Sequence, residues 1–183
     1  MTEAPFPMSL TERLTIMKNI VLIGMPGCGK STVGVVLAKN MAMDFVDSDL
    51  VIQRSEGAKL SVLLDQFGDE GFRQIENRVN TSLDVENSII ATGGSVIYGQ
   101  EAMEHLKQIG TVIYLHLSYE QIEERLGDLH ARGVTIKPGQ TLRDLYNERC
   151  PMYEKWADIT VHCDGMRLRE VVLYITDKLS KMN

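Results

Sequence analysis

The chain has 183 residues, of which 44% are hydrophobic and 24% are charged. These proportions are typical of one folded globular domain and exclude a disordered or fibrous chain. The net charge of -6 argues against a nucleic-acid partner, because binding to a phosphate backbone requires clustered Lys and Arg side chains.

Cysteine usage and the apolar pattern indicate a cytoplasmic protein. The cysteines Cys28, Cys150 and Cys163 form no C-x-x-C pair, so neither a disulfide framework nor a zinc site is expected. Residues 1–18 lack the apolar core of a signal peptide and are predicted to be a leader ahead of a single domain, residues 19–183. No stretch reaches the roughly 18 apolar residues of a membrane helix. We expect no membrane partner, and we expect a monomer.

Short segments rich in Val and Ile alternate with helical patterns along the chain. Strands are predicted at Asn19–Ile23, Asp44–Val46, Ser88–Ala91, Thr111–Leu117 and Ile159–His162. Apolar residues recur at helical spacing in Lys30–Met41, Glu120–Leu126 and Leu168–Leu179. This alternation is typical of an α/β fold with a parallel sheet and helices on both faces.

Two segments depart from the simple alternation. Leu60–Leu83 is longer than a bare crossover and contains Gly68 and Gly71, which predicts two helices separated by a turn. It belongs to an excursion, about residues 48–84, that could cap a substrate pocket. The Gly- and Pro-containing stretch at about residues 129–140 has the composition of a mobile lid.

A phosphate-loop pattern occurs where its mechanism requires it. GMPGCGKS, residues 24–31, fits G-x-x-x-x-G-K-[ST] and lies between a predicted strand and a predicted helix. Lys30 should reach the β and γ phosphates of ATP, and the Ser31 hydroxyl should bind Mg²⁺. The residues expected to hold the nucleotide are Gly27, Cys28, Gly29, Lys30, Ser31 and Thr32. A chance match is the alternative, and the flanking elements disfavour it.

Two carboxylates, Asp47 and Asp49, follow the second predicted strand. Ligands of open α/β sheets bind at the carboxyl ends of the strands. Asp47 could hold Mg²⁺ or accept the proton of an attacking hydroxyl, and Asp49 could hydrogen-bond a hydroxyl of the acceptor. The alternative is that one of them caps the next helix.

Arginines and glycines farther along could complete an acceptor site. Arg73, within the excursion, could grip a carboxylate through two hydrogen bonds. Arg149, in the run Glu148-Arg149-Cys150-Pro151, is expected near the end of a helix because a proline follows. A solvated helix surface is the alternative for both arginines. Gly93 and Gly94 follow the third strand and would allow close approach of a ligand to the backbone.

Two cations near the predicted lid stand out in an acidic chain. Arg125 and Arg132 flank the start of that stretch. An Arg that a closing loop carries into the site can neutralise charge on the transferring phosphoryl group. The sequence therefore predicts a phosphotransferase with a closing lid.

Four motifs together resemble the shikimate kinase family of P-loop kinases. They are GMPGCGKST, FVDSD, FGDEGFRQIE and ERCPMYEKWAD, and their order and spacing also follow the family. The resemblance covers nearly all of the chain after Lys18. It implies a three-layer α/β/α P-loop kinase fold with a five-stranded parallel sheet in the order 2-3-1-4-5. It also implies ATP-dependent phosphorylation of the 3-hydroxyl of shikimate, with Mg²⁺.

The resemblance assigns roles position by position. It implies catalytic roles for Lys30, Asp47 and the lid residue Arg132, and Mg²⁺ binding by Ser31 and Asp47. Arg125 resembles the Arg that lies beside adenine. The residues implied to bind the acceptor are Asp49, Arg73, Gly93, Gly94 and Arg149.

Two departures from the family pattern concern the acceptor. Gly93-Gly94-Ser95 stands where the family usually has three consecutive glycines, which suggests a shortened pocket wall. The R-P-L-L stretch of the lid is replaced by ARGVTIKPG, residues 131–139. Another small hydroxy acid, such as homoserine, therefore remains an alternative acceptor.

Two further function classes compete with a kinase. A nucleotide-dependent switch would use the same phosphate loop, and Asp65-Gln66-Phe67-Gly68 matches a short D-x-x-G pattern, but no N-K-x-D motif follows. A catalytically silent scaffold is the other class, and the presence of Lys30, Ser31, Asp47 and Asp49 argues against it.

Overall fold

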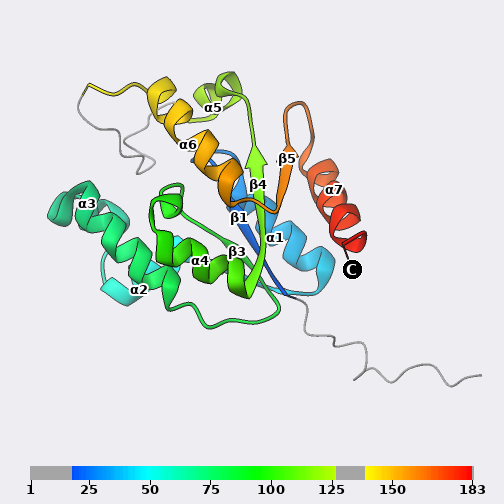
Figure 1. Cartoon of the computed structure of the whole chain (residues 1–183), viewed down its shortest axis with the longest axis horizontal. Coiled ribbons are helices and arrows are strands. Elements are labelled where there is room, and N and C mark those ends of the chain that lie inside the picture. The colour runs from blue at the N-terminus through cyan, green and yellow to red at the C-terminus, as the bar shows by residue number, and fades with distance from the viewer. Residues whose placement is uncertain (1–17, 127–138, 183) are drawn as a thin grey trace, which may run out of the picture.

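The computed structural model describes residues 18–126 and 139–182. Its centre is a parallel sheet of five strands in the order β2-β3-β1-β4-β5, which Figure 1 shows between helices. The strands are β1 (Asn19–Ile23), β2 (Asp44–Asp47), β3 (Ser88–Ala91), β4 (Gly110–His116) and β5 (Ile159–His162). The predicted strand order and all five predicted strands are confirmed, with one-residue differences at the ends of β2 and β4.

The central strand β1 places the phosphate loop. All residues of its sequence NIVLI are buried, and it pairs with β3 on one side and β4 on the other. A strand that is covered on both faces needs a continuous run of apolar residues, and such a run can be recognised in the sequence. The direction of the strand order reverses at β1, and such a point is where open α/β sheets bind ligands.

Helices cover both faces of the sheet. The helices α1 (Lys30–Met41) and α7 (Leu168–Ser180) pack together on one face, while α4 (Gln100–Ile109) and α6 (Leu142–Trp156) contact β4 on the other. The short helix α5 (Tyr119–Leu126) follows β4, and the 3-10 turn η1 (Val96–Tyr98) precedes α4. These layers are the predicted three-layer α/β/α arrangement.

The excursion between β2 and β3 consists of α2 (Ser48–Glu56) and α3 (Leu60–Thr81). Gly68 has φ 66°, a left-handed conformation that breaks α3 into two parts. The predicted break is confirmed at Gly68, whereas the helix continues through Gly71. Arg78 of α3 forms an ion pair with Glu56 of α2 at 2.9 Å.

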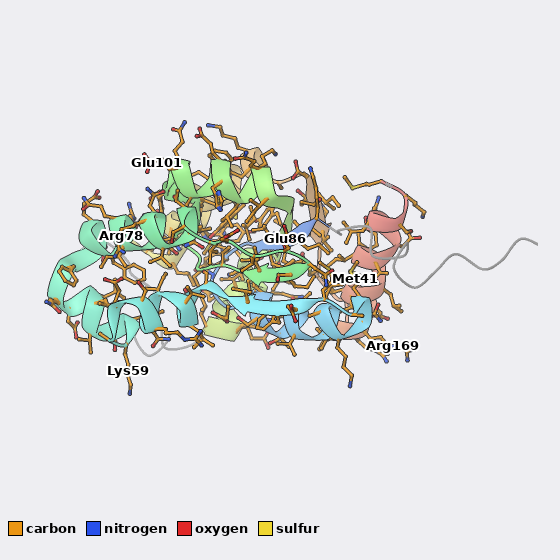
Figure 2. The ribbon with its side chains drawn as sticks, turned by 90° about the horizontal axis from the view of Figure 1, so that it is seen from below. Met41, Lys59, Arg78, Glu86, Glu101 and Arg169 are labelled. Carbon is orange, nitrogen blue, oxygen red and sulfur yellow. The ribbon has the colours of Figure 1, made fainter. Side chains whose placement is uncertain are left out.

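The excursion also has its own apolar centre. A separate cluster formed by Ile52, Leu63, Phe72 and Val79 packs between α2 and α3. Figure 2 shows side chains filling the space between these helices and the sheet, with Lys59 pointing outward. The excursion is therefore a small packed unit attached to the side of the sheet.

One local prediction was wrong. Arg149 was expected near a helix end, but it lies well inside α6, and the helix continues past Pro151. Proline removes one helical N–H and disfavours the helix before it. Burial of Leu145, Arg149 and Tyr153 on one face of α6 outweighs this local cost, as does a capping box between Thr141 and Asp144 at the start of the helix.

Three predictions concern residues outside the described ranges. Residues 1–17 of the predicted leader and residues 129–138 of the predicted lid, including Arg132, fall there. Among the described residues, none of the helices has the combination of length and apolar content that crossing a membrane demands.

Candidate active site

The phosphate loop connects β1 to α1 as predicted. Gly29 has φ 101° and precedes the first residue of α1, a left-handed conformation that residues other than Gly adopt with difficulty. The first N–H groups of α1 have no partners within the helix, and they carry partial positive charge. The loop therefore presents donors and a positive helix end to an anion.

Lys30 is held over the loop by the loop itself. Its side chain is buried, and Nζ donates hydrogen bonds to the carbonyl oxygens of Gly24 at 2.8 Å and Met25 at 3.1 Å. Carbonyl oxygens are weaker partners for an ammonium group than phosphate oxygens, because hydrogen bonds between two charged groups are the stronger ones. Lys30 is thus held against the phosphate loop by hydrogen bonds that a phosphate group could replace.

The two predicted magnesium ligands contact each other. The Ser31 hydroxyl donates to Asp47 Oδ2 at 2.8 Å. The other oxygen, Oδ1, accepts from the backbone N–H groups of Asp49 at 3.0 Å and Leu50 at 3.4 Å, and so caps α2. The capping alternative therefore applies to Asp47, but it engages only one of the two oxygens.

This pair has the donor chemistry of a magnesium site. Mg²⁺ takes oxygen ligands, usually from one or two side chains and substrate phosphates, and it retains several waters. The hydroxyl of Ser31 and the carboxylate of Asp47 supply such oxygens beside the phosphate loop. The residues present fit the ion.

The loop separates two cavities. One of about 440 Å³ lies on the side of the excursion and is bordered by Lys30, Ser31, Asp49, Phe72, Glu76 and Gly93, among others. The other, of about 240 Å³, lies on the side of α7 and is bordered by Cys28, Thr32, Arg125, Cys163, Met166 and Val171, among others. We call them the acceptor cavity and the base cavity. Gly27, Gly29 and Thr32 border both.

Glu76 is a site residue that the sequence analysis did not single out. It is fully buried on α3, and Oε1 has no hydrogen-bond partner among the described residues. Burial raises the pKa of Glu76 from 4.5 to about 7, while the Ser95 hydroxyl and the charges of Arg149 and Arg73 oppose this rise. An unpaired buried carboxyl oxygen in a cavity is ready to receive a hydroxyl donor. Its spacing of one helical turn from Arg73 was the signal available in FRQIE.

The acceptor cavity requires glycine at two positions. A Cβ on Gly93 would collide with the Glu76 carboxylate and lie 3.0 Å from Asp49 Oδ1. A Cβ on Gly94 would lie 2.8 Å from the Pro26 ring and 3.3 Å from Arg149 Nη1. The predicted glycine segment therefore brings both acidic side chains and Arg149 against one backbone wall. Burial, followed by the charge of Asp47, raises the pKa of Asp49.

The two predicted carboxylate-binding arginines occupy different positions. Arg149 is buried against Gly94, while Arg73 is half-buried with its guanidinium carbon 3.8 Å from the centre of the Tyr98 ring. Neither borders the acceptor cavity, although both act on the charge of Glu76. The structure thus brings Lys30, Ser31, Asp49 and both glycines to one cavity, with Asp47 bound to Ser31. It places Arg149 beside Gly94 and Arg73 beside Tyr98.

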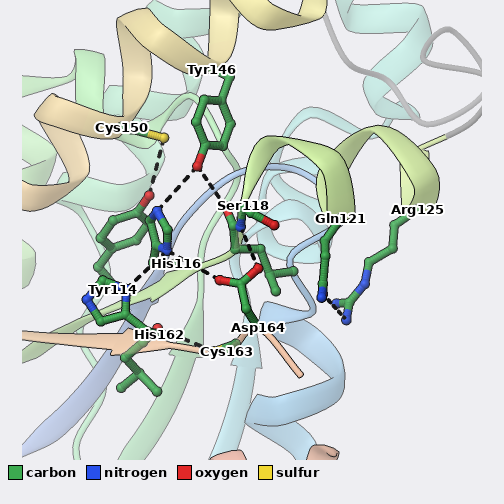
Figure 3. A network of polar contacts seen from close by, with 12 residues as sticks. Tyr114, His116, Ser118, Gln121, Arg125, Tyr146, Cys150, His162, Cys163 and Asp164 are labelled. Carbon is green, nitrogen blue, oxygen red and sulfur yellow. Dashed lines mark hydrogen bonds and ion pairs between the residues drawn. The ribbon is translucent and has the colours of Figure 1, made fainter. Parts of the chain in front are cut away.

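Arg125 borders the base cavity, and its predicted place beside adenine remains a prediction. Figure 3 shows it on α5 next to Gln121, to which it donates a hydrogen bond of 3.5 Å.

A polar network lies at the ends of β4 and β5, where the ring nitrogens of His116 and His162 lie 3.2 Å apart and Tyr146 bonds to His116 at 3.3 Å. Burial, and then the neighbouring His162, lowers the pKa of His116, so this network fixes α6 without charging His116 at neutral pH.

The phosphate loop lies at the point where the strand order reverses. It has a polar cavity on one side and a base-sized cavity on the other. Together these features define a phosphotransferase that acts on a small molecule. The protein-family comparison then identifies its group. A family model described as shikimate kinase matches residues 26–180, and the chain belongs to this family.

Individual relatives agree with this assignment. The shikimate kinase of Haemophilus influenzae is 37% identical over 170 residues, which cover 91% of this chain and 94% of the relative. That of Thermodesulfovibrio yellowstonii is 36% identical over 170 residues, with coverage of 91% and 98%.

Solved structures give the same result. The shikimate kinase of Acinetobacter baumannii, in complex with shikimate, aligns with a TM-score of 0.84 and 32% identity over 94% of this chain and 98% of its own. The Aquifex aeolicus enzyme aligns with a TM-score of 0.75 and 32% identity, over 88% and 96% of the two chains.

Proposed function

We propose that this chain transfers the γ-phosphoryl group of ATP to the 3-hydroxyl of shikimate. The observation that carries the proposal is the acceptor cavity, where Asp49, Glu76 and the wall of Gly93 and Gly94 face the phosphate loop. Shikimate offers several hydroxyls and a carboxylate, and these are the groups that carboxylate oxygens and arginines bind. Relatives of this family and the complex of the Acinetobacter enzyme with shikimate support the choice of acceptor.

The nucleotide would lie across the phosphate loop, with its base in the base cavity beside Arg125. The ammonium of Lys30 would leave the carbonyl oxygens of Gly24 and Met25 for the β and γ phosphates. Ser31 and Asp47 would hold Mg²⁺, which when bound neutralises charge on the phosphates. We also propose that Arg132 neutralises charge on the transferring phosphoryl group, as the sequence analysis predicts.

The chemical step is an in-line displacement. The 3-hydroxyl oxygen forms a bond to the γ phosphorus, the bond between that phosphorus and the β,γ-bridging oxygen breaks, and ADP leaves. Asp49 borders the acceptor cavity, whereas Asp47 faces Ser31 and caps α2. We therefore assign the hydroxyl proton to Asp49 and keep Asp47 for the metal. Arg149, beside Gly94, and Arg73 would bind the carboxylate of the acceptor at the edge of the acceptor cavity.

The enzyme is proposed to act as a monomer in the cytoplasm. Among the alternatives, homoserine also offers a hydroxyl and a carboxylate, but it lacks the ring hydroxyls that a cavity with both Asp49 and Glu76 can bind. A nucleotide switch or a silent scaffold would leave this acidic acceptor cavity without a use.

The test is coupled release of ADP by the purified chain with Mg²⁺ and a panel of hydroxy acids. We expect shikimate to stimulate ADP release far above the rate without an acceptor, with the phosphate on the 3-hydroxyl of the product. Stimulation by homoserine without stimulation by shikimate would replace the proposed acceptor. A complete absence of acceptor-dependent turnover would refute the kinase assignment.

A further inference from the structure

Tyr98 is the last residue of η1 and has no role in the function proposed above. Its side chain is half-buried. It borders a third cavity, of about 590 Å³, together with Arg73. The other residues that border this cavity come from α3 and from the start of α4. Tyr98 is thus placed beside the two arginines rather than in the acceptor cavity.

The aromatic ring of Tyr98 supports Arg73. The guanidinium carbon of Arg73 lies 3.8 Å from the ring centre, within the range of a cation–π interaction. A guanidinium that stacks on a ring keeps the N–H donors on its edge available for a planar pair of oxygens. The ring therefore fixes the plane of Arg73 without consuming the donors that a carboxylate needs.

The hydroxyl of Tyr98 contacts the second arginine. Arg149 Nε donates to this hydroxyl at 3.4 Å, and the guanidinium carbon of Arg149 lies 5.4 Å from the ring centre. The terminal Nη1 is directed toward Gly94, as the distance of 3.3 Å to a Cβ built there shows. One side chain thus contacts both arginines, which are far apart in the sequence.

Glu148 fixes the direction of these hydrogen bonds. The Tyr98 hydroxyl donates to Glu148 Oε1 at 2.6 Å. Burial, and then this bond, raises the pKa of Tyr98 above its ordinary value, so the phenol keeps its proton at neutral pH. Because the proton points to Glu148, the oxygen lone pairs remain for Arg149. Glu148 precedes Arg149 in α6, so Tyr98 is tied to the helix that carries this arginine.

We propose that Tyr98 is the positioning residue that holds Arg73 and Arg149 in a single arrangement for the carboxylate of the acceptor. This inference rests on the proposed function. Without the ring, Arg73 would sample many rotamers in the open third cavity, and binding would have to order it again. The loss would fall on the acceptor rather than on ATP, because Tyr98 is not among the residues that border the base cavity.

The experiment compares Tyr98→Leu and Tyr98→Phe with the unchanged chain in steady-state kinetics. We expect Tyr98→Leu to raise the KM for the acceptor by roughly tenfold, the size of one half-buried cation–π contact. The KM for ATP should stay unchanged. Tyr98→Phe keeps the ring and loses the hydroxyl, so its KM for the acceptor should lie between that of the unchanged chain and that of Tyr98→Leu.

A matched control is Tyr174→Leu. Tyr174 is an exposed residue of α7 that also stacks with a cation, Lys178, and its replacement should change neither KM. A second readout uses the acceptor with its carboxylate converted to a carboxamide. The preference of the unchanged chain for the carboxylate should shrink in Tyr98→Leu, which a general loss of packing would not produce.

The proposal would be overturned if Tyr98→Leu raised the KM for the carboxylate and for the carboxamide equally. It would also be overturned if the KM values for the acceptor and for ATP rose equally. If Tyr98→Leu does not fold, Tyr98→Phe decides, and an unchanged KM for the acceptor overturns the proposal. Each of these kinetic measurements uses the hydroxy acid that the unchanged chain phosphorylates. A failure of shikimate itself therefore refutes the proposed function and leaves the assignment of Tyr98 separately testable.

Discussion

The Ser31 hydroxyl donates a hydrogen bond of 2.8 Å to Asp47, which joins the first turn of α1 to the end of β2. Both groups are bound to each other before any ion arrives, so little rearrangement is needed to bring two oxygens to one metal. The same contact connects the phosphate loop to Asp47, the residue that immediately precedes the excursion. In the proposed function, the nucleotide and the acceptor would therefore meet at this pair.

Replacement of Ser31 with Ala should therefore weaken the use of Mg²⁺. We expect kcat to fall by roughly 10²-fold or more, because a metal ligand contributes several kcal/mol to charge stabilisation. Titration of activity with MgCl₂ at saturating ATP measures the effect. Ser31→Thr is the matched control, since Thr also satisfies the phosphate-loop pattern. Equal activity in Ser31→Ala and the unchanged chain would remove Ser31 from the metal site.

Replacement of Lys30 with Ala should abolish turnover. The ammonium is the charged side chain that the phosphate loop holds over itself, and its loss leaves the transferring phosphates without that partner. Rate losses of about 10³-fold are typical for removal of one electrostatic partner of a transition state. Acceptor-dependent ADP release measures turnover, and circular dichroism checks the fold. Acceptor-dependent turnover at the rate of the unchanged chain would contradict the mechanism.

Glu76 should make stability depend on pH. Its pKa is raised from 4.5 to about 7, so between these values the unfolded chain loses a proton that the folded chain keeps. The free energy of unfolding must therefore fall as pH rises through this window, by about 3 kcal/mol for a shift of this size. Below the window the full stability is present.

Glu76→Gln should remove this contribution. Urea unfolding between pH 4 and pH 8 measures it as the difference between the variant and the unchanged chain, so that other titrating groups cancel. Ser95→Ala removes the hydroxyl that favours the ionised form of Glu76, and this variant should show a steeper decline than the unchanged chain. A parallel pH profile for Glu76→Gln and the unchanged chain would show that Glu76 titrates normally.

Gly93→Ala should close the acceptor cavity. The added methyl group would collide with Glu76 and crowd Asp49, and overpacking of this kind costs about 1–3 kcal/mol. We expect a KM for the acceptor at least about tenfold higher, with little change in the KM for ATP. An unchanged KM for the acceptor would mean that Glu76 can move out of the way.

The sequence was informative wherever local pattern decides structure. The buried strands are apolar runs because both faces of the sheet are covered, and the phosphate loop needs glycine and lysine at fixed spacing. The features that were missed depend on tertiary contacts. Pro151 suggested a helix end, but the burial of Arg149 and Tyr153 carries α6 through it. No local rule could weigh that packing against the cost of a proline.

The site residues divide in the same way. Lys30 and Ser31 lie in one loop motif, and Asp47 ends another strand of the same parallel sheet, so the predicted sheet edge places all three near one another. Glu76 and Tyr98 acquire their importance only when α3, η1 and α6 come together. In the sequence, Glu76 is one of several acidic residues on an amphipathic helix, and Tyr98 follows a glycine turn without a motif of its own.

The separate apolar cluster of the excursion has a consequence for cooperativity. Ile52, Leu63, Phe72 and Val79 pack with one another rather than with the main core, and Gly68 interrupts the helix that carries three of them. Such a unit can open on its own at a lower free energy than global unfolding. Amide protons of α2 should therefore exchange with deuterium faster than those of β1, and bound acceptor should slow that exchange. If this exchange pattern is found, the side of the site proposed to select the acceptor opens more easily than the central strand that carries the phosphate loop.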